Sequence, residues 1–372
     1  MKKEEMDEAF EKLLVPIREL YSEITTKGTP FCYPLIYNDI DEDFLGYIVP
    51  LIKKYVARVK KMDEKGIFVL NHAFDKLPSS CKPQKSFDFL RDLEAVSDMV
   101  VEVLTDSYRC YPDDAFQKLK KFFEDDDNFY LYMLPQLKVS RSCFYRIRTG
   151  TFDHSNDGKL FHIPFEKRHL VSSQRYSIPG YPILYLAGSL FTAWCEMDKP
   201  ELAGMSFAGF KFKDNAVFLD LGYPFKGETL WQWYSLFVMY PLLMACMVRV
   251  KHPSAPFKPE YIMPQLMTKL VREHGCLFKG IAYMSNKLPD VSPIESLSSR
   301  NFAVCTYNCI CSKGYDKDLA AEMEMTDIKT ITNDDIRKSV SVINGKYSVD
   351  FHMLENRDEQ SFRDINVSMV LG

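Results

Sequence analysis

Apolar side chains in roughly the first 140 residues recur at steps of three and four, the spacing of amphipathic helices. The runs extend from Met6 to Ile24, Phe44 to Val59, Phe87 to Leu104 and Pro112 to Phe123. Pro112 and Asp113 favour a helix start, and the acidic stretch from Glu124 to Asp127 is expected to end that helix. The pattern predicts an N-terminal helical domain over residues 1–139.

From about Ser140 the pattern changes to short β-prone stretches separated by Gly and Pro turns. The predicted strands are Cys143 to Arg148, Ile183 to Leu186, Ala216 to Leu219, Gly280 to Met284 and Phe302 to Cys311. Helical segments are expected at Phe191 to Met197, Trp231 to Val250 and Pro264 to His274. This mixture predicts an α+β domain over residues 140–312, with residues 313–372 as a C-terminal extension packed on the core.

Composition and charge narrow the classes of partner. The chain has 372 residues, 46% of them hydrophobic and 26% charged, so it can bury a sizeable core. A formal net charge of −4 argues against a general nucleic-acid footprint. The ten cysteines are irregularly spaced, and the opening residues, MKKEEMDEAFEKLL, lack the apolar centre of a signal peptide. We therefore expect free thiols and a cytoplasmic protein.

The most apolar stretch, Leu236 to Val248, is shorter than the roughly 20 residues that a membrane span needs. We expect it to form a buried helix that is interrupted at Pro241, because proline lacks the backbone N–H of a helix interior. No membrane contact is expected.

Several site motifs can be excluded from spacing alone. Cys305, Cys309 and Cys311 lack the C-x-x-C spacing of zinc sites, and buried structural thiols explain them better. No metal site is therefore expected. The sequence also lacks G-x-x-x-x-G-K-[ST] and G-x-G-x-x-G, which argues against P-loop and Rossmann nucleotide enzymes.

The strand FYRIR holds the first candidate site residue, Arg146. Alternation along a strand places Phe144, Arg146 and Arg148 on one face. An inward arginine needs an anionic partner, because burying an unpaired charge is costly. That partner is either a phosphate or carboxylate of a ligand, or an Asp or Glu in a structural ion pair.

The segment RYSIPGYPILYLAGSLFTAWCE combines Arg175, a Pro-Gly turn, an apolar strand with Tyr185 and a helical stretch that ends in Glu196. Arg175 is either a solvated loop residue or the cation of a site. Tyr185 is either a core tyrosine or a ring that stacks on a flat heterocycle. Glu196 follows apolar residues, so its carboxylate must be paired or hydrogen-bonded. It lies either on a helix surface or beside a sugar carbon that develops positive charge.

The stretch GIAYMS predicts a strand with Ser285 at its exit. Serine at a strand end is usually a turn residue. No G-x-S-x-G elbow surrounds Ser285, and the seven histidines show no matching arrangement. We interpret Ser285 as a hydrogen-bonding residue and not as an acyl-enzyme nucleophile.

Taken in order, these elements resemble the RES domain, a family named for an arginine, a glutamate and a serine. FYRIR, RYSIPGYPILYLAGSLFTAWCE and GIAYMS match its motifs, with Gln265 in the helix before the last strand and NFAVCTYN after it. The resemblance covers Arg141 to Cys311. It implies an ADP-ribosyltransferase-like mixed β core, to which this chain adds the N-terminal helical domain.

Members of this family are toxins of bacterial toxin–antitoxin pairs that degrade NAD or transfer its ADP-ribose to a protein. The resemblance implies an enzyme that takes NAD as substrate, without a metal, by hydrolysis, phosphorolysis or transfer, with an antitoxin or another protein as partner. It implies that Arg146 and Arg175 hold the pyrophosphate or adjacent ribose hydroxyls, and that Tyr185 packs on the nicotinamide. Glu196 is then expected to act at the scissile ribose, and Ser285 to hold the nicotinamide-side ribose.

The chain departs from the family in two ways. It is longer than the compact toxins at both ends, and RYSIPG replaces the Arg-aromatic-Asn turn common in the family. Two further interpretations therefore stay open. One is a non-catalytic module that binds or senses a nucleotide, and the other is that the helical N-terminal region docks a partner or covers the site.

Overall fold

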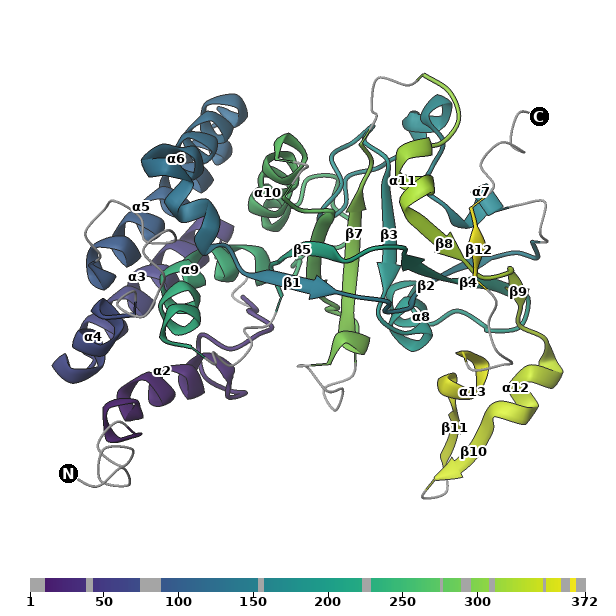
Figure 1. Ribbon diagram of the computed structural model, residues 1–372, viewed down its shortest axis with the longest axis horizontal. Coiled ribbons are helices and arrows are strands. Elements are labelled where there is room, and N and C mark those ends of the chain that lie inside the picture. The colour runs from purple at the N-terminus through teal and green to yellow at the C-terminus, as the bar shows by residue number, and fades with distance from the viewer. Residues whose placement is uncertain are drawn as a thin grey trace. The chain divides into compact units, whose positions relative to one another are not determined.

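A computed structural model describes residues 11–37, 43–73, 88–152, 157–222, 229–274, 277–288, 296–307, 312–343, 346–355 and 362–365. The chain forms two compact units, each built from two separate stretches of sequence (Figure 1). The first unit comprises Met1–Pro135 and Leu221–Met267, and the second comprises Gln136–Asp220 and Thr268–Gly372. The sequence pattern predicted that the helical unit is confined to the N-terminal part of the chain. The structure adds Leu221–Met267 to it.

The first unit is helical. Its helices are α2 (Val15–Thr25), α3 (Phe44–Lys60), α4 (Glu64–Asn71), α5 (Phe89–Tyr108), α6 (Pro112–Met133), α9 (Leu230–Met247) and the start of α10 (Ile262–Glu273), with a 3₁₀ turn at Pro259–Tyr261. The buried carboxylate of Asp92 on α5 accepts hydrogen bonds from the hydroxyls of Tyr130, at 3.1 Å, and Tyr234, at 2.6 Å. These donors make the burial of Asp92 tolerable and tie α5 to α6 and α9.

Helix α9 runs without interruption through Pro241, contrary to the prediction of a break. Proline at this position leaves the carbonyl of Phe237 without its helical donor. The hydroxyl of Tyr55 on α3 donates to that carbonyl at 3.1 Å, which offsets the loss. Among the described residues, α9 is the one helix long and apolar enough to cross a membrane, and 78% of that window is buried inside the protein.

Helix α6 also differs from its predicted extent. It continues past the acidic stretch at Glu124 to Met133, where the sequence suggested a stop. Phe129, Tyr130 and Leu131 in this last part are buried. Apolar packing therefore outweighs the poor helix propensity of successive aspartates.

The second unit is built around a ten-stranded sheet with the order β1-β5-β6-β7-β3-β2-β4-β8-β12, and β9 pairs with β4. Neighbouring strands are antiparallel except β5 and β6, which are parallel. The strands are β1 (Gln136–Val139), β2 (Phe144–Thr149), β3 (Ile183–Ala187), β4 (Met205–Phe212), β5 (Ala216–Asp220), β6 (Gly280–Met284), β7 (Arg300–Cys305), β8 (Met323–Met325), β9 (Lys329–Thr330) and β12 (Arg363–Asp364). The predicted strands at β2, β3, β5 and β6 are confirmed, whereas β1 and β4 were not predicted.

Short helices and one hairpin complete this unit. They are α7 (Asp157–Leu160), α8 (Leu190–Glu196), α11 (Lys317–Glu322), α12 (Asn333–Ser339), α13 (Phe351–Glu355), 3₁₀ turns at Phe165–Leu170 and Leu297–Ser299, and the hairpin of β10 (Val340–Ile343) and β11 (Lys346–Val349). The predicted C-terminal extension does more than cover the core, because β8 and β12 extend the sheet beyond β4.

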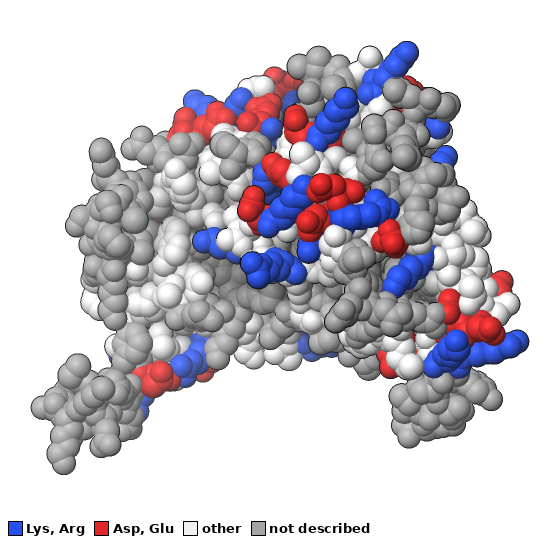
Figure 2. All heavy atoms as spheres, turned by 45° about the vertical axis from the view of Figure 1, so that its right-hand side comes forward, with Lys and Arg blue, Asp and Glu red and all other residues white. Residues whose placement is uncertain are grey.

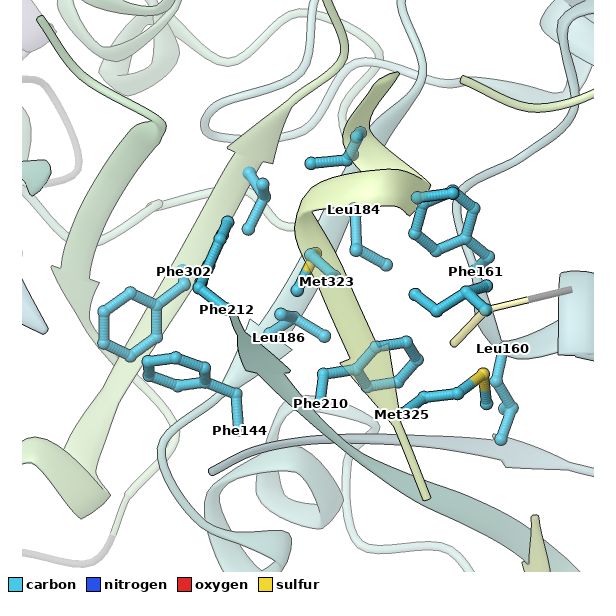
Figure 3. Packing of buried hydrophobic residues seen from close by; sticks show 14 of the residues in the cluster. Phe144, Leu160, Phe161, Leu184, Leu186, Phe210, Phe212, Phe302, Met323 and Met325 are labelled. Carbon is cyan, nitrogen blue, oxygen red and sulfur yellow. The ribbon is translucent and has the colours of Figure 1, made fainter. Parts of the chain in front are cut away.

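Apolar side chains cover both faces of the sheet. On one face Phe144, Leu184, Phe210, Phe302 and Met323 pack together (Figure 3). On the other face Tyr145, Ala187 and Phe207 pack with Leu190 of α8 and with neighbouring residues. Successive residues of β2 thus point into two different cores, as the two-residue period of a strand requires.

A buried ion pair joins three central strands. Arg300, the first residue of β7, is fully buried and donates from Nη1 to the carboxylate of Asp220, the last residue of β5. Strand β6 lies between these two strands.

The backbone carbonyl of Arg300 also accepts from the amide of Gly188 at 2.8 Å. A side chain at position 188 would place its Cβ 1.9 Å from the carbonyl oxygen of Leu297, so glycine is required there.

Charges of both signs are interleaved on the face shown in Figure 2. The ion pairs of the β4, β8 and β12 region include Lys211 with Glu324, at 2.9 Å, and Lys213 with Asp364, at 2.7 Å. Arg363 and Asp327 pair at 2.8 Å beside them. Such charged side chains on outer strands hinder pairing with a second sheet.

The pH dependence of folding stability can test the burial of His162 in the second unit. The ring is fully buried: Nδ1 donates to the carbonyl of Ile163 at 2.7 Å, and Nε2 accepts from the amide of Asp316 at 2.8 Å. Burial lowers the pKa of His162 from its ordinary 6.5 to about 4. The unfolded chain therefore binds a proton between these two pH values while the folded chain does not. Folding stability should fall as the pH drops from about 6.5 to about 4, by about 3 kcal/mol in all.

Urea unfolding of the wild type and of His162→Gln between pH 7.5 and 4 measures this contribution. The variant should lack the part of the pH dependence that His162 contributes, because no imidazole remains at that position. His252→Gln, which replaces an exposed histidine, is the matched control. A stability curve for His162→Gln parallel to that of the wild type would contradict the assignment.

Candidate functional site

Tyr185 is the point at which several predicted site residues meet. It lies on β3, paired with Ala303 of β7, and its hydroxyl is 2.8 Å from Oγ of Ser177. Its backbone carbonyl accepts a hydrogen bond from Nη1 of Arg146 at 3.1 Å. One residue thus links the arginine of β2 to the side chains gathered around the phenol.

Arg146 projects from β2 on the same face as Phe144 and Arg148, as strand alternation predicted. Strands β2 and β3 are in register at Tyr145 opposite Ala187, and Arg146 reaches β3 at the carbonyl of Tyr185. Burial, reinforced by the nearby charge of Arg148, lowers the pKa of Arg146 to about 9. In the described part of the chain, no carboxylate lies within ion-pair distance of this half-buried guanidinium, which donates to a backbone carbonyl instead.

Glu196 is the last residue of α8. The helix starts at the N-cap Ser189, whose hydroxyl accepts from the amide of Thr192 at 3.1 Å. At the other end, Oε1 of Glu196 accepts from Nδ2 of Asn301 at 2.6 Å. The backbone carbonyl of Glu196 accepts from Nζ of Lys287 at 2.7 Å. Two contacts therefore fix the carboxylate and the helix end that carries it.

Tyr283 brings Glu196 into a wider group. Ala187, Asn301 and Tyr283 lie opposite one another on β3, β7 and β6, so their side chains share one face of the sheet. Burial first, and then the negative charge of Glu196, raise the pKa of Tyr283 well above that of a free tyrosine. The nearby Tyr185 also raises the pKa of Tyr283.

Two residues of the RYSIPG loop also reach Tyr283. The ring centroid of Tyr176 lies 4.6 Å from that of Tyr283. The positive charge of Arg175 opposes the rise in the pKa of Tyr283, which places this arginine near the same phenol. Arg175, Tyr185 and Glu196, which come from one continuous segment, therefore all influence the pKa of a tyrosine from a later strand.

Ser285 follows β6 directly, two residues beyond Tyr283, and is 3% exposed. Its amide donates to the carbonyl of Ser299 at 3.4 Å, and its Oγ accepts from the amide of Lys287 at 3.3 Å. Because Lys287 in turn contacts the carbonyl of Glu196, Ser285 is joined to α8 through the turn that it stabilises.

The structure thus brings Arg175, Tyr185 and Glu196 near Tyr283. It joins Ser285 to α8 through Lys287 and places Arg146 differently. Within the described residues, no hydrogen bond or ion pair joins Arg146 to Glu196. Tyr283, Asn301 and Lys287 belong to the group but received no role from the sequence. Asn301 offered a signal, because it is the polar first residue of the apolar stretch NFAVC.

The chemistry of this donor set suits an anionic ligand with a flat ring. Arginines bind phosphate through planar, multiple hydrogen bonds, and tyrosine rings pack on heterocycles. Among the described residues, no three His, Cys, Asp or Glu side chains are grouped so that they could hold a metal ion. Cys305 is buried, while Cys309 and Cys311 lie outside the described residues.

Comparisons with known proteins give one informative match. A protein of Bacillus subtilis (strain 168) named "Putative toxin YopC" is 29% identical to this chain over 238 residues. The match covers 57% of this chain and 52% of that protein, so it spans about half of the relative's length. No protein-family model matches the chain, and no solved structure matches it.

Two arginines of the same sheet should respond oppositely to the same substitution. Arg300→Met removes the guanidinium that pairs with the buried carboxylate of Asp220 and should lower the free energy of unfolding by about 3–5 kcal/mol. Arg146→Met removes a desolvated charge that no carboxylate compensates, so the free energy of unfolding should stay unchanged or rise by up to about 2 kcal/mol. Urea denaturation of both variants at pH 7 compares them directly. A loss of 3 kcal/mol or more in Arg146→Met would show that Arg146 is a structural residue instead.

Proposed function

We propose that this protein consumes NAD by cleaving the bond between nicotinamide and ribose. The observation that carries the proposal is a desolvated arginine without an acidic partner, linked through Tyr185 to a group that contains a held carboxylate. A protein keeps such an arginine at a cost in stability, and an anionic ligand supplies the missing counterion. The ordered RES-like motifs support NAD as that ligand.

The residues of the candidate site have the chemical groups that this reaction requires. As the C–N bond breaks, its electron pair leaves with nicotinamide, which becomes neutral, and positive charge develops on the ribose carbon. Glu196, oriented by Asn301, would stabilise that charge electrostatically. Arg146 and Arg175 would hold the pyrophosphate, and Tyr185 and Tyr283 would pack against the nicotinamide end. Ser285 would hold the adjacent ribose. Water, phosphate or a protein side chain would then bond to the ribose carbon, and a proton of the attacking group would pass to solvent.

We further propose that the activity serves a toxin that a protein partner restrains in the cytoplasm. The name of the Bacillus subtilis relative supports the toxin part of this proposal. The partner follows from the activity, because a producing cell needs protection from an enzyme that depletes its own NAD.

A mass-spectrometric assay of NAD products tests the activity. Purified protein is incubated with NAD in buffer alone, with phosphate, and with cell lysate. We expect free nicotinamide in at least one arm, and the second product identifies the acceptor. Glu196→Gln keeps the size of the side chain and its contact with Asn301 but removes the charge. It should lower kcat by about 100-fold or more while NAD binding persists.

The matched control is Glu201→Gln, which removes an exposed carboxylate a few residues further along the chain and should leave turnover unchanged. Binding of intact NAD by the wild type with no nicotinamide release in any arm would instead favour a nucleotide-binding module without catalysis. Absence of both binding and turnover would refute the proposal altogether.

A further inference from the structure

Helix α8 carries Glu196 but is too short to hold its own position. It has seven residues, about two turns, and isolated helices of this length do not form in water. The location of the Glu196 carboxylate therefore depends on contacts made along α8 by other segments. Those contacts come from three regions distant in sequence.

Two of these contacts come from loops of the sheet unit, one just before β7 and one just after β6. Oγ1 of Thr192 donates to the carbonyl of Ser298 at 2.6 Å, just before β7. At the far end, Lys287 donates to the carbonyl of Glu196 and also pairs with Asp198 at 2.8 Å. These contacts hold one side and the C-terminal end of the helix.

The N-terminal end of α8 is held by the C-terminal part of the chain. Oε1 of Glu355, the last residue of α13, accepts from the amide of Leu190 at 2.6 Å, and Glu355 is 7% exposed. The first amides of a helix have no partner within the helix, and a negative charge there is favourable. Phe351 of α13 packs on Phe191 and Trp194, with ring centroids 5.2 and 5.3 Å away.

We propose that Glu355 is a positioning residue that holds α8, and thereby Glu196, in the geometry that the site requires. Its consequence for turnover rests on the proposed function, whereas its effect on α8 does not. Loss of the carboxylate would release the start of the helix, although Thr192 and Lys287 would keep the rest in place. The expected result is a loosened α8 in a folded protein.

The charged and titratable groups around Glu355 come from two elements. His352, one turn earlier on α13, lies 3.3 Å from Oε2, and Asp350 precedes α13. Cys143 and Tyr145 face Glu355 from β2 and its approach. Burial raises the pKa of Glu355 above that of an ordinary glutamate, against the opposing effect of the Leu190 amide. Protonation on acidification should therefore weaken the contact at a higher pH than for an exposed carboxyl.

Hydrogen exchange and steady-state kinetics of the full chain test the proposal. In Glu355→Ala, amides of residues 190–196 should exchange about tenfold faster, while those of β7 keep wild-type protection. With NAD as the probe, kcat should fall about 10- to 100-fold and KM should change little. Glu355→Gln retains an acceptor for the Leu190 amide and should restore part of both losses. Asp334→Asn, an exposed carboxylate on α12, is the control and should alter neither.

The pH profile separates positioning from general destabilisation. In the wild type, protection of residues 190–196 and kcat should decline together as Glu355 becomes protonated, and Glu355→Gln should lack this acid limb. Unchanged exchange at α8 in Glu355→Ala, or an identical acid limb in Glu355→Gln, would overturn the proposal. If the wild type does not cleave NAD, the proposed function fails, and the exchange data alone decide whether Glu355 positions α8.

Discussion

The buried pair of Arg300 and Asp220 is the constraint on which the sheet unit depends. Two charges removed from water are tolerated only when they meet, so β5 and β7 have one acceptable register around β6. That register places Asn301, the next residue of β7, beside Tyr283 and within reach of Glu196. A purely structural interaction thus determines where the polar residues of the candidate site lie.

Arg146 and Arg300 show that an arginine withdrawn from solvent can be either a structural residue or a candidate ligand-binding residue. Both arginines lie on central strands, but Arg300 is fully buried whereas Arg146 is half-buried. Arg300 has a carboxylate at its guanidinium, whereas Arg146 donates to a backbone carbonyl and keeps a lowered pKa. The difference between them is the presence of a counterion within the protein. It is this difference, and not the motif alone, that favours a ligand at Arg146.

The local pattern of the sequence predicted β2, β3 and β6 well, because alternation and turn residues act within a few positions. It could not predict that Tyr283 and Asn301 belong with Glu196, because this depends on which strands pair. Nor could it predict that α9 survives Pro241, because the compensating hydroxyl of Tyr55 comes from a helix about 180 residues away in sequence. Arg175, Tyr185 and Glu196 come from one short segment, so the sequence alone suggested that they lie near one another. The position of Arg146 depends on how β2 pairs with β3, which the sequence does not show.

The division of the helical unit between two stretches of sequence limits how this protein can be dissected. Helix α9 lies in the connection between the parallel strands β5 and β6, yet its buried side chains pack among helices from the beginning of the chain. A fragment that starts after Pro135 would keep α9 but lose Tyr55 and Asp92, its polar partners. Such a fragment would present one of the most apolar helices of the chain to solvent, and aggregation of the truncated product would then say nothing about the sheet unit.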